Sequence, residues 1–266
     1  MADDRIPTMH RRTKLLIGGT TTVFVLLLTL AGAVWPLDAA LRVNFAESSQ
    51  GPSLAHPLGT DRFGRDQLGR LVVGSRMSLE AAAAAALTAC AIGGAIGFVA
   101  RTVGWARVCV TLLARVLFFL PGKLLSPHGW GRWIVAAGCL AQLIPPTWLA
   151  LVVVVLIAPG WGVNATVVGL IFAVPSAYVL SHSESLPSGS RLWCPLFLSL
   201  FCWAMLVMFV LDALSLGIQP PTPSWGGLTD RGAWSGWLAS CAPIAVALGL
   251  LALADALAVP ASADRS

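Results

Sequence analysis

The residues best able to do chemistry are gathered in two polar segments that interrupt long apolar runs. The first segment, 56–66, is rich in Arg and Asp and is punctuated by two glycines, which permit backbone turns that other residues resist. Its Asp61, Arg65 and Asp66 can form ion pairs or cap a neighbouring helix. The second segment, 217–227, holds three prolines, which favour a stiff, extended chain. These residue types predict rigid polar turns at the ends of apolar helices.

The sequence offers no residue set for catalysis, metal binding or nucleotide binding. The four histidines lie in polar loops or tails, so no serine–histidine pair within an apolar run is evident. His56 has no His or Cys near it that would complete a metal site. The six cysteines lie in apolar stretches without a CxxC spacing, which favours packing over metal or disulfide use. No P-loop pattern occurs. We therefore expect no cofactor, no metal and no enzymatic activity in this chain.

The composition is that of a membrane protein. Hydrophobic residues make up 57% of the 266 residues and charged residues 11%, whereas soluble domains average about 25% charged residues. Apolar runs of the roughly 20 residues that span a bilayer recur along the chain. Because these runs are continuous and do not alternate, they favour helices over a closed barrel. The expected fold class is an all-α, polytopic membrane protein. The net charge of +5 comes without a basic run interleaved with aromatics, so we expect no nucleic acid partner.

The N-terminal residues predict the orientation of the chain. Arg5, Arg11, Arg12 and Lys14 precede the first apolar run, which places the N-terminus in the cytoplasm by the positive-inside rule. The run itself is too long for a signal peptide and has no clear small-residue cleavage site. The expected organisation is a cytoplasmic tail at 1–14, a first transmembrane helix at 15–36, an external loop at 37–76, a transmembrane core at 77–259 and a C-terminal tail at 260–266.

The two polar segments resemble the signature loops of the C-type permease subunits of dipeptide/oligopeptide/nickel-type ABC importers. The family pattern at the first loop, H-P-L-G-T-D-x-x-G-R-D-x-L-x-R-L-x-x-G-x-R-x-S-L, is followed from His56 to Leu79. The second pattern, L-G-x-Q-P-P-x-P-x-W-G, is met by Leu216 to Gly226. The site residues that the resemblance implies are His56, Pro57, Leu58, Gly59, Thr60, Asp61, Gly64, Arg65, Asp66 and Arg76 in the first loop, and Gln219, Pro220, Pro221, Pro223, Trp225 and Gly226 in the second.

The resemblance implies a fold, a function and partners. The fold is that of a type I ABC importer permease, with about six transmembrane helices in the cell (inner/plasma) membrane and both termini in the cytoplasm. The function is half of the translocation pathway for dipeptides or oligopeptides, with haem or nickel also transported in the family. The partners are a homologous second permease, cytoplasmic ATP-binding subunits, an external substrate-binding (lipo)protein and membrane lipids. The first loop is expected to brace the second span, to contact the binding protein, or to do both.

Two other classes of function compete with this one. An ion-coupled secondary transporter is the alternative, but such proteins use several buried ionisable residues near the midplane, and only Asp212 is a candidate here. An intramembrane enzyme needs a nucleophile with a base, or paired acids, at membrane depth, and no such set is evident.

Seven apolar stretches compete for six spans. They are about 15–36, 77–100, 106–125, 133–158, 161–180, 192–217 and 237–259. In the family both signature loops lie on the external face, so an even number of crossings must separate them. The weakest stretch is 106–125, because a charge such as Arg115 near a helix centre costs about 2.5–3.5 kcal/mol. We expect 101–132 to be an insertion on the cytoplasmic side, with a seventh span as the alternative.

Three further features have sequence-based interpretations. Glu80 is expected in the first turn of the second span, where a carboxylate meets the positive end of the helix dipole. Asp212, the only acid near the end of its apolar run, is a candidate for lining the pathway or for helix packing. Trp225, with Trp234 and Trp237, fits a belt of aromatic residues at the membrane interface.

The family's cytoplasmic coupling loop, with its E-A-A-x-x-x-G pattern, is absent. In the family this loop docks the permease on the ATPase. This chain has only the short polar segment 181–191 in its place. The candidate coupling residues are Ser181, His182, Glu184, Ser185 and Arg191. We expect a degenerate contact there, with segment 101–132 adding to it or replacing it.

Overall fold

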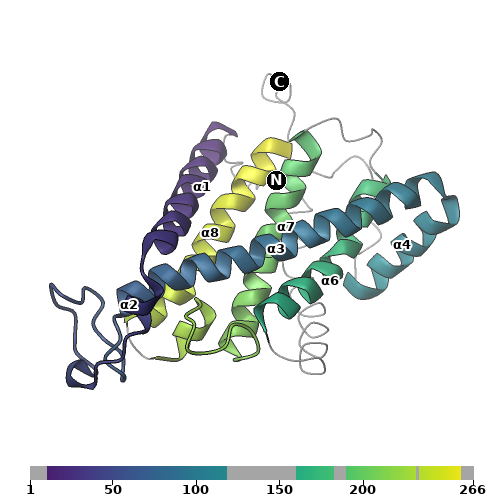
Figure 1. Ribbon diagram of the computed structural model, residues 1–266. Coiled ribbons are helices and arrows are strands. Elements are labelled where there is room, and N and C mark those ends of the chain that lie inside the picture. Colours follow the sequence, from purple (N-terminus) through teal and green to yellow (C-terminus); the bar gives the residue numbers. More distant parts are fainter. Residues whose placement is uncertain (1–10, 119–159, 183–189, 232–233, 259–266) are drawn as a thin grey trace, which may run out of the picture.

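The fold is a bundle of helices, seen in a computed structural model that describes residues 11–118, 160–182, 190–231 and 234–258 (Figure 1). The α-helices are α1 (Arg11–Val34), α2 (Leu37–Leu41), α3 (Gln67–Thr102), α4 (Gly104–Phe118), α6 (Trp161–His182), α7 (Ser190–Ala213) and α8 (Trp234–Ala258). Two short 3-10 helices are η1 (Phe45–Glu47) and η3 (Gly226–Arg231). No strand occurs in these ranges. Within the described ranges, five helices are long and apolar enough to cross a membrane: Arg12–Val34, Gln67–Thr102, Trp161–His182, Trp193–Ala213 and Gly236–Ala258. The expected all-α, polytopic membrane fold is confirmed.

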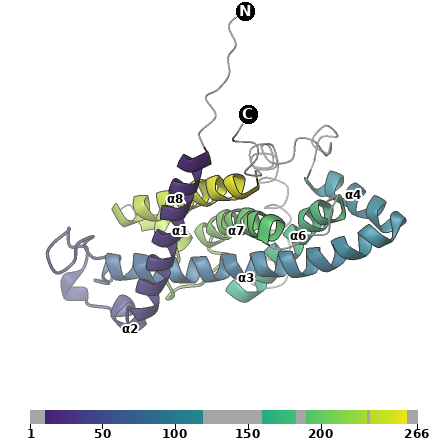
Figure 2. The same cartoon turned by 90° about the horizontal axis from the view of Figure 1, so that it is seen from above.

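The long helix α3 organises the bundle: α6 lies along it, and α1, α7 and α8 run at a steep angle to it (Figures 1 and 2). Its 36 residues make it about 54 Å long at 1.5 Å per residue, more than the ~30 Å of a hydrocarbon core. It begins at Gln67, before the predicted position 77, because the Asp66 carboxylate caps it and accepts from the Gly69 N–H at 2.7 Å. The second half of the first signature motif is therefore helical. Glu80 lies in the helix interior, where the Arg76 Nε donates to its carboxylate at 2.6 Å, so the helix-start interpretation of Glu80 is wrong.

Small residues hold α3 and α6 together as two parallel helices. A side chain at Gly169 would meet Ala85 and Thr88, and one at Gly97 would meet Ala177 and Leu180. Residue numbers thus rise together along the two helices. Small residues allow membrane helices to approach closely, and this packing supplies much of their attraction in lipid.

The first and last spans run antiparallel. Gly18 of α1 lies against Leu253 of α8, and Thr21 lies against Gly249. Next to this contact, closer to the N-terminus of α1, Lys14 forms an ion pair with Asp255. The beginning of α1 and the end of α8 are therefore at the same end of the bundle.

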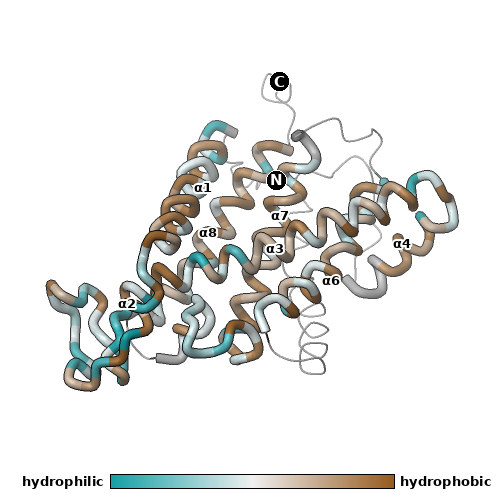
Figure 3. The backbone as a smooth tube through the Cα atoms, viewed as in Figure 1, coloured by the Kyte–Doolittle hydropathy of each residue, from teal (hydrophilic) through white to brown (hydrophobic). Residues whose placement is uncertain are grey.

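Hydropathy separates the ends of the bundle from its middle (Figure 3). Hydrophilic residues gather in the loop before α3 and at the start of α1, whereas the helices are mostly hydrophobic. The core is formed by α3, α6, α7 and α8, with Val168, Met205, Met208 and Val246 among its fully buried side chains. This arrangement is what a bundle surrounded by hydrocarbon requires.

Part of the predicted topology lies outside the described residues. This holds for the proposed span 133–158 and for 119–125 of the stretch 106–125. The rest of that stretch belongs to α4, in which side chains are described as far as Leu113. This helix packs on the last turns of α3 and α6, where Val110 joins a cluster with Ala100, Ala177 and Tyr178.

Candidate functional site

The first signature loop is built around the carboxylate of Asp61. One oxygen, Oδ1, accepts from the backbone N–H groups of Phe63 at 2.8 Å and Arg65 at 3.0 Å. The other, Oδ2, accepts from the Arg65 Nε at 2.8 Å and from the Arg70 Nη1 at 2.9 Å. All three charged side chains are buried. The Arg65 guanidinium also lies over the Phe63 ring, 4.7 Å from its centroid. A buried charge is tolerated when it is paired and hydrogen-bonded in this way.

Electrostatics keep Asp61 ionised. Burial raises the pKa of the Asp61 carboxyl, but the hydrogen bonds from the Arg65 side chain and from the backbone of Arg65 and Phe63 outweigh it, and the pKa is lowered. Because its pKa is lowered, the ionised carboxylate stabilises the loop at every pH above the ordinary pKa of aspartate. This contribution is lost as pH falls through the pKa of the folded state.

Two glycines of the motif have backbone angles that favour glycine. Gly59 has φ +74° and Gly64 has φ +71°. A Cβ at Gly64 would also collide with the carbonyl oxygen of Asn44, because the two backbone segments touch there. Between the glycines, Thr60 is buried and its hydroxyl accepts from the Gln50 N–H at 2.9 Å and donates to the Glu47 carbonyl oxygen. The motif therefore sets the path of a folded loop.

His56 belongs to the same network. Its Nδ1 lies 3.2 Å from Asp66 Oδ1, and its Nε2 lies 3.6 Å from Glu47 Oε2. Of the next two motif residues, Pro57 is exposed and Leu58 is partly buried. Among the described residues no group of three His, Cys, Asp or Glu could hold a metal ion.

The tip of the first loop presents apolar side chains that the motif does not contain. Leu54 is fully exposed, Phe45 is 71% exposed and Val43 is 49% exposed. These residues belong to no sequence motif, although isolated apolar residues within a polar loop are a pattern that could have identified them. Exposed apolar side chains held on a rigid loop are suited to contact another protein.

The second signature loop is built around another aspartate, Asp212, at the end of α7. Its Oδ1 accepts from the Ile218 N–H at 2.8 Å, and Ser224 adds a side-chain hydrogen bond. Gly217 and Gly226 lie so close to Asp212 that a Cβ on either would overlap it. Asp212 is 2% exposed. These contacts place the carboxylate against the loop that follows α7.

The remaining residues of this loop divide between its surface and its interior. Gln219, Pro220 and Pro221 are exposed, and Gln219 donates to the Ser215 carbonyl oxygen at 2.8 Å. Pro223 and Trp225 are buried. Trp225 is 1% exposed and packs within the core, so its assignment to an interfacial belt is wrong.

The other two tryptophans of the expected belt differ from Trp225. Trp237 is 72% exposed, as expected of a residue that faces lipid or its headgroups. The side chain of Trp234 lies outside the described part of the structure.

The second signature loop meets the helical half of the first motif, although about 150 residues separate them in the chain. The Trp225 N–H donates to the Ser78 hydroxyl at 3.1 Å, and Gly74 lies against the backbone of Ser224. Ser78 and Gly74 are motif positions on α3, and both are small and buried. We call the end of the bundle that holds both loops the motif end.

Asn164 adds a third element to the motif end. It lies in the first turn of α6, is fully buried, and donates from Nδ2 to the Leu216 carbonyl oxygen at 2.7 Å. The sequence analysis did not select this residue. A lone polar residue at the beginning of an apolar helix was the only pattern available to find it.

Two of the candidate coupling residues lie at the opposite end. Ser181 and His182 form the last turn of α6. The Arg107 Nη2 of α4 donates to the Ser181 carbonyl oxygen at 2.6 Å, and the Thr111 hydroxyl lies 3.4 Å from His182 Nε2. Glu184, Ser185 and the side chain of Arg191 are outside the described part of the structure.

One face of α3 stays open and differs from the lipid-facing surfaces. Arg76 and Glu80 form an ion pair there, with side chains 37% and 47% exposed. Further along the same helix, Ala91 and Ala95 are exposed together with the large apolar residues Leu87 and Phe98. On α1, by contrast, the exposed residues are large and apolar, among them Leu16, Val23, Leu26, Leu27 and Leu30. Charges in a membrane helix generally face protein or water, and small residues favour helix contacts.

Comparison with known proteins identifies the kind of subunit. No profile of a known protein family matches the chain. The glutathione transport system permease protein GsiD of Pectobacterium atrosepticum is 30% identical over 242 residues, which cover 79% of this chain and 72% of the relative. The GsiD proteins of Shigella dysenteriae and Escherichia coli are 29% identical over 233 residues, 80% of this chain and 72% of each relative.

These relatives agree with the motifs and with the helical fold. They are inner-membrane components of complexes that also contain ATPase and substrate-binding partners, and ATP hydrolysis lies in the separate ATPase subunits. The chain belongs to the multi-pass inner-membrane permease subunits of binding-protein-dependent ABC importers.

Proposed function

We propose that this permease forms half of the translocation pathway for small peptides, including the tripeptide glutathione. The observation that carries this proposal is the contact of the second signature loop with the helical half of the first motif, which joins the two motifs of the permease family at one end of the bundle. The names of the relatives, glutathione transport system permease proteins, support the substrate class. An ion-coupled transporter finds less support, because Asp212, its one candidate acid, is engaged in holding the second loop.

The motif end is proposed to face outward and both termini inward. The cations before α1 support this orientation by the positive-inside rule. The parallel packing of α3 and α6 supports six spans, because an odd number of crossings must return the chain from the end of α3 to the start of α6. The charge of Arg115 within 106–125 supports leaving this stretch out of that count.

Thiol labelling of intact cells tests the orientation. We expect a membrane-impermeant thiol reagent to label Ser53→Cys and Gln219→Cys, because both positions are exposed on the motif loops. Thr13→Cys, exposed in the first turn of α1, serves as the matched control and should react only after the cells are permeabilised. The parent for all three variants lacks the native cysteines. Labelling of Ser53→Cys and Gln219→Cys from opposite sides would contradict the six-span arrangement.

The open face of α3 is proposed to meet the second, homologous permease. Its exposed alanines allow a close helix contact, and its Arg76–Glu80 pair would lie between two proteins and not in lipid. The exposed tip at Val43, Phe45 and Leu54 is proposed to contact the external binding protein.

Proteoliposomes with the whole complex test the transport function. We expect uptake of labelled glutathione or dipeptides to require the binding protein and ATP on the ATPase side. Uptake should survive a proton uncoupler. Uptake that persists without ATP and collapses with the uncoupler would favour the ion-coupled alternative. Uptake of nickel or haem but of no peptide would retain the importer and refute the substrate class.

The same proteoliposomes test how this subunit is coupled to the ATPase. We propose that α4 and the last turn of α6 together replace the missing coupling loop, because Arg107 and Thr111 join them. Arg107→Ala should weaken the rise of ATP hydrolysis that substrate induces, whereas Arg101→Ala, at the end of α3, should change it less. An unchanged response in Arg107→Ala would assign coupling to the partner permease.

A further inference from the structure

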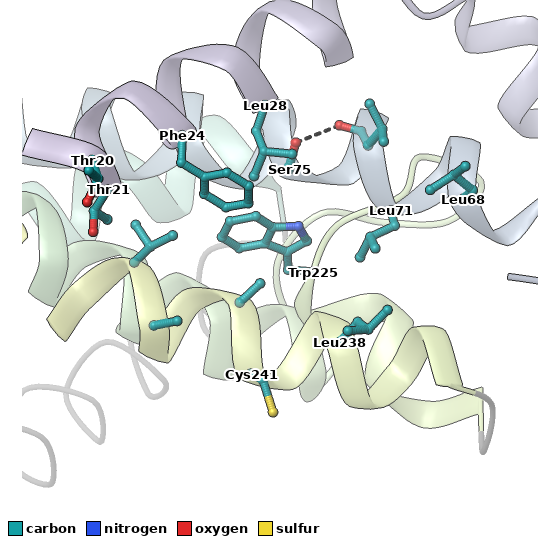
Figure 4. A pocket seen from close by; sticks show the side chains of 14 residues that line it. Thr20, Thr21, Phe24, Leu28, Leu68, Leu71, Ser75, Trp225, Leu238 and Cys241 are labelled. Carbon is teal, nitrogen blue, oxygen red and sulfur yellow. Dashed lines mark hydrogen bonds between the residues drawn. The ribbon is translucent and has the colours of Figure 1, made fainter. Parts of the chain in front are cut away.

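A cavity of about 600 Å³ lies between α1, α3 and α8, away from the open face of α3 (Figure 4). Its walls are mostly apolar, and the indole of Trp225 lies in the middle of the lining side chains. Residues that line it include Phe24 and Leu28 of α1, Leu71 of α3, and Leu238 and Ala242 of α8. The cavity opens at the surface of the bundle, so a molecule that lies against this surface can enter it.

The cavity exists because α1 touches the bundle at two separate places. Near its end, Gly32 lies against Val72 and Arg76 of α3, and near its beginning Gly18 lies against Leu253 of α8. Between these contacts, Phe24 and Leu28 of α1 line the cavity. The second signature loop inserts Trp225 into the resulting wedge but does not fill it.

The lining offers no partner for a charged group inside the cavity, and few free hydrogen-bonding groups for a polar one. No ionisable acid or base lines the cavity. The hydroxyl of Thr21 donates to the Ile17 carbonyl oxygen at 2.8 Å, and that of Ser75 to the Val72 carbonyl oxygen at 2.6 Å. The hydroxyl of Thr20 is likewise bonded within its own helix. The indole N–H of Trp225 donates to no described residue, although the side chain is 1% exposed. A hydrocarbon ligand with one carbonyl group would match this lining.

Its position determines the source of such a ligand. The walls are membrane-spanning helices, and two lining residues, Phe24 and Leu238, also lie on the outer surface, where they are 53% and 47% exposed. The cavity is thus continuous with a surface of large apolar residues. Lipid surrounds that surface.

We propose that this cavity binds one phospholipid, with an acyl chain between α1, α3 and α8 and an ester carbonyl at the Trp225 indole N–H. The acyl chain fills the wedge by van der Waals contact. Lipid tails and protein side chains are equally apolar, so the attraction comes from close packing and not from leaving the bilayer. The lipid joins α1 to the second signature loop. It is a permanent part of the subunit's packing and is not transported.

Photocrosslinking tests the site in the whole complex. The complex is placed in nanodiscs that contain a phospholipid with a diazirine in one acyl chain, and the adducts are mapped by mass spectrometry. We expect adducts on cavity residues of α1 and α8. In Ala242→Phe, which places a ring in the cavity, their yield should fall by about tenfold, the change that about 1.4 kcal/mol produces.

Two further variants distinguish binding in the cavity from contact with bulk lipid. Ile244→Phe adds the same ring on the exposed side of α8, outside the cavity lining, and should leave the cavity adducts unchanged. Trp225→Phe keeps an aromatic ring but removes the indole N–H, and should release the lipid at lower detergent concentration. Equal loss of adducts in Ala242→Phe and Ile244→Phe, or cavity adducts to the second permease and none to lipid, would overturn the proposal. Either result leaves the importer function untouched.

Discussion

The substitution Asp61→Asn is expected to unfold the first signature loop and to abolish assembly of the importer. It removes the buried negative charge that Arg65 and Arg70 share, and so leaves two buried cations without their counter-ion. Breaking a buried ion pair by removing one partner costs about 3–5 kcal/mol, a large part of the stability of a typical domain. The measurement is the fraction of the purified complex that remains monodisperse after heating, compared with the wild type.

The matched control for Asp61→Asn is Asp38→Asn. Asp38 is also an aspartate before α3, in the first turn of α2, but it is exposed. Its loss should change stability by no more than the about 0.5 kcal/mol of an ordinary surface substitution. Equal stability of the two variants would show that the Asp61 cluster does not hold the loop.

The substitution Gly93→Val is expected to separate α3 from α6. A Cβ at Gly93 would overlap the Ser176 hydroxyl and would approach the Ala173 carbonyl oxygen to 2.5 Å. The same hydroxyl donates to the Ala89 carbonyl oxygen at 2.8 Å, so the insertion also removes a buried hydrogen bond between the helices. Overpacking a well-packed contact costs about 1–3 kcal/mol or more. We expect a cost at the upper end of this range, because on the α6 side the added side chain meets backbone atoms.

Gly19→Val is the control for this second prediction. Gly19 lies in α1, and a Cβ there has no atom within 4 Å. Both variants put the same β-branched residue into a helix, so any difference between them reports packing and not helix propensity. The yield of folded subunit in the membrane and its recovery with the second permease measure the outcome. If both variants assemble equally well, the close approach of α3 and α6 at Gly93 is not required.

The assignment of charged residues shows how far the sequence alone could reach. Asp61, Arg65 and Asp66 were expected to pair or to cap a helix, because their spacing of a few residues lets local geometry decide their partners. Arg70 completes the cluster from the first turn of α3. It could be expected there only if the start of that helix were known, and hydropathy placed the start too late. The polar motif residues of α3 lower its local hydropathy, although the helix continues through them.

Trp225 and Asp212 show what local patterns cannot supply. A tryptophan in a polar loop has the sequence pattern of an interfacial anchor, yet Trp225 is buried because Ser78 and Gly74 of α3 receive the loop that carries it. An acid near the end of an apolar helix resembles a pathway residue, yet Asp212 accepts from the loop that follows it. In both cases the partner is fixed by how the helices pack.

By itself the sequence determined the class of the protein, its helical spans and the family to which its two motifs belong. These follow from properties that are local in the chain: hydrophobic runs of bilayer length, turn-forming glycines and prolines, and closely spaced opposite charges. Only the tertiary structure decided that the two motifs form one site, that α3 starts within the first motif, and that a lipid-sized cavity remains beneath α1. Those features depend on contacts between residues far apart in the chain, and such contacts arise where small residues on two helices permit close approach and where larger residues do not.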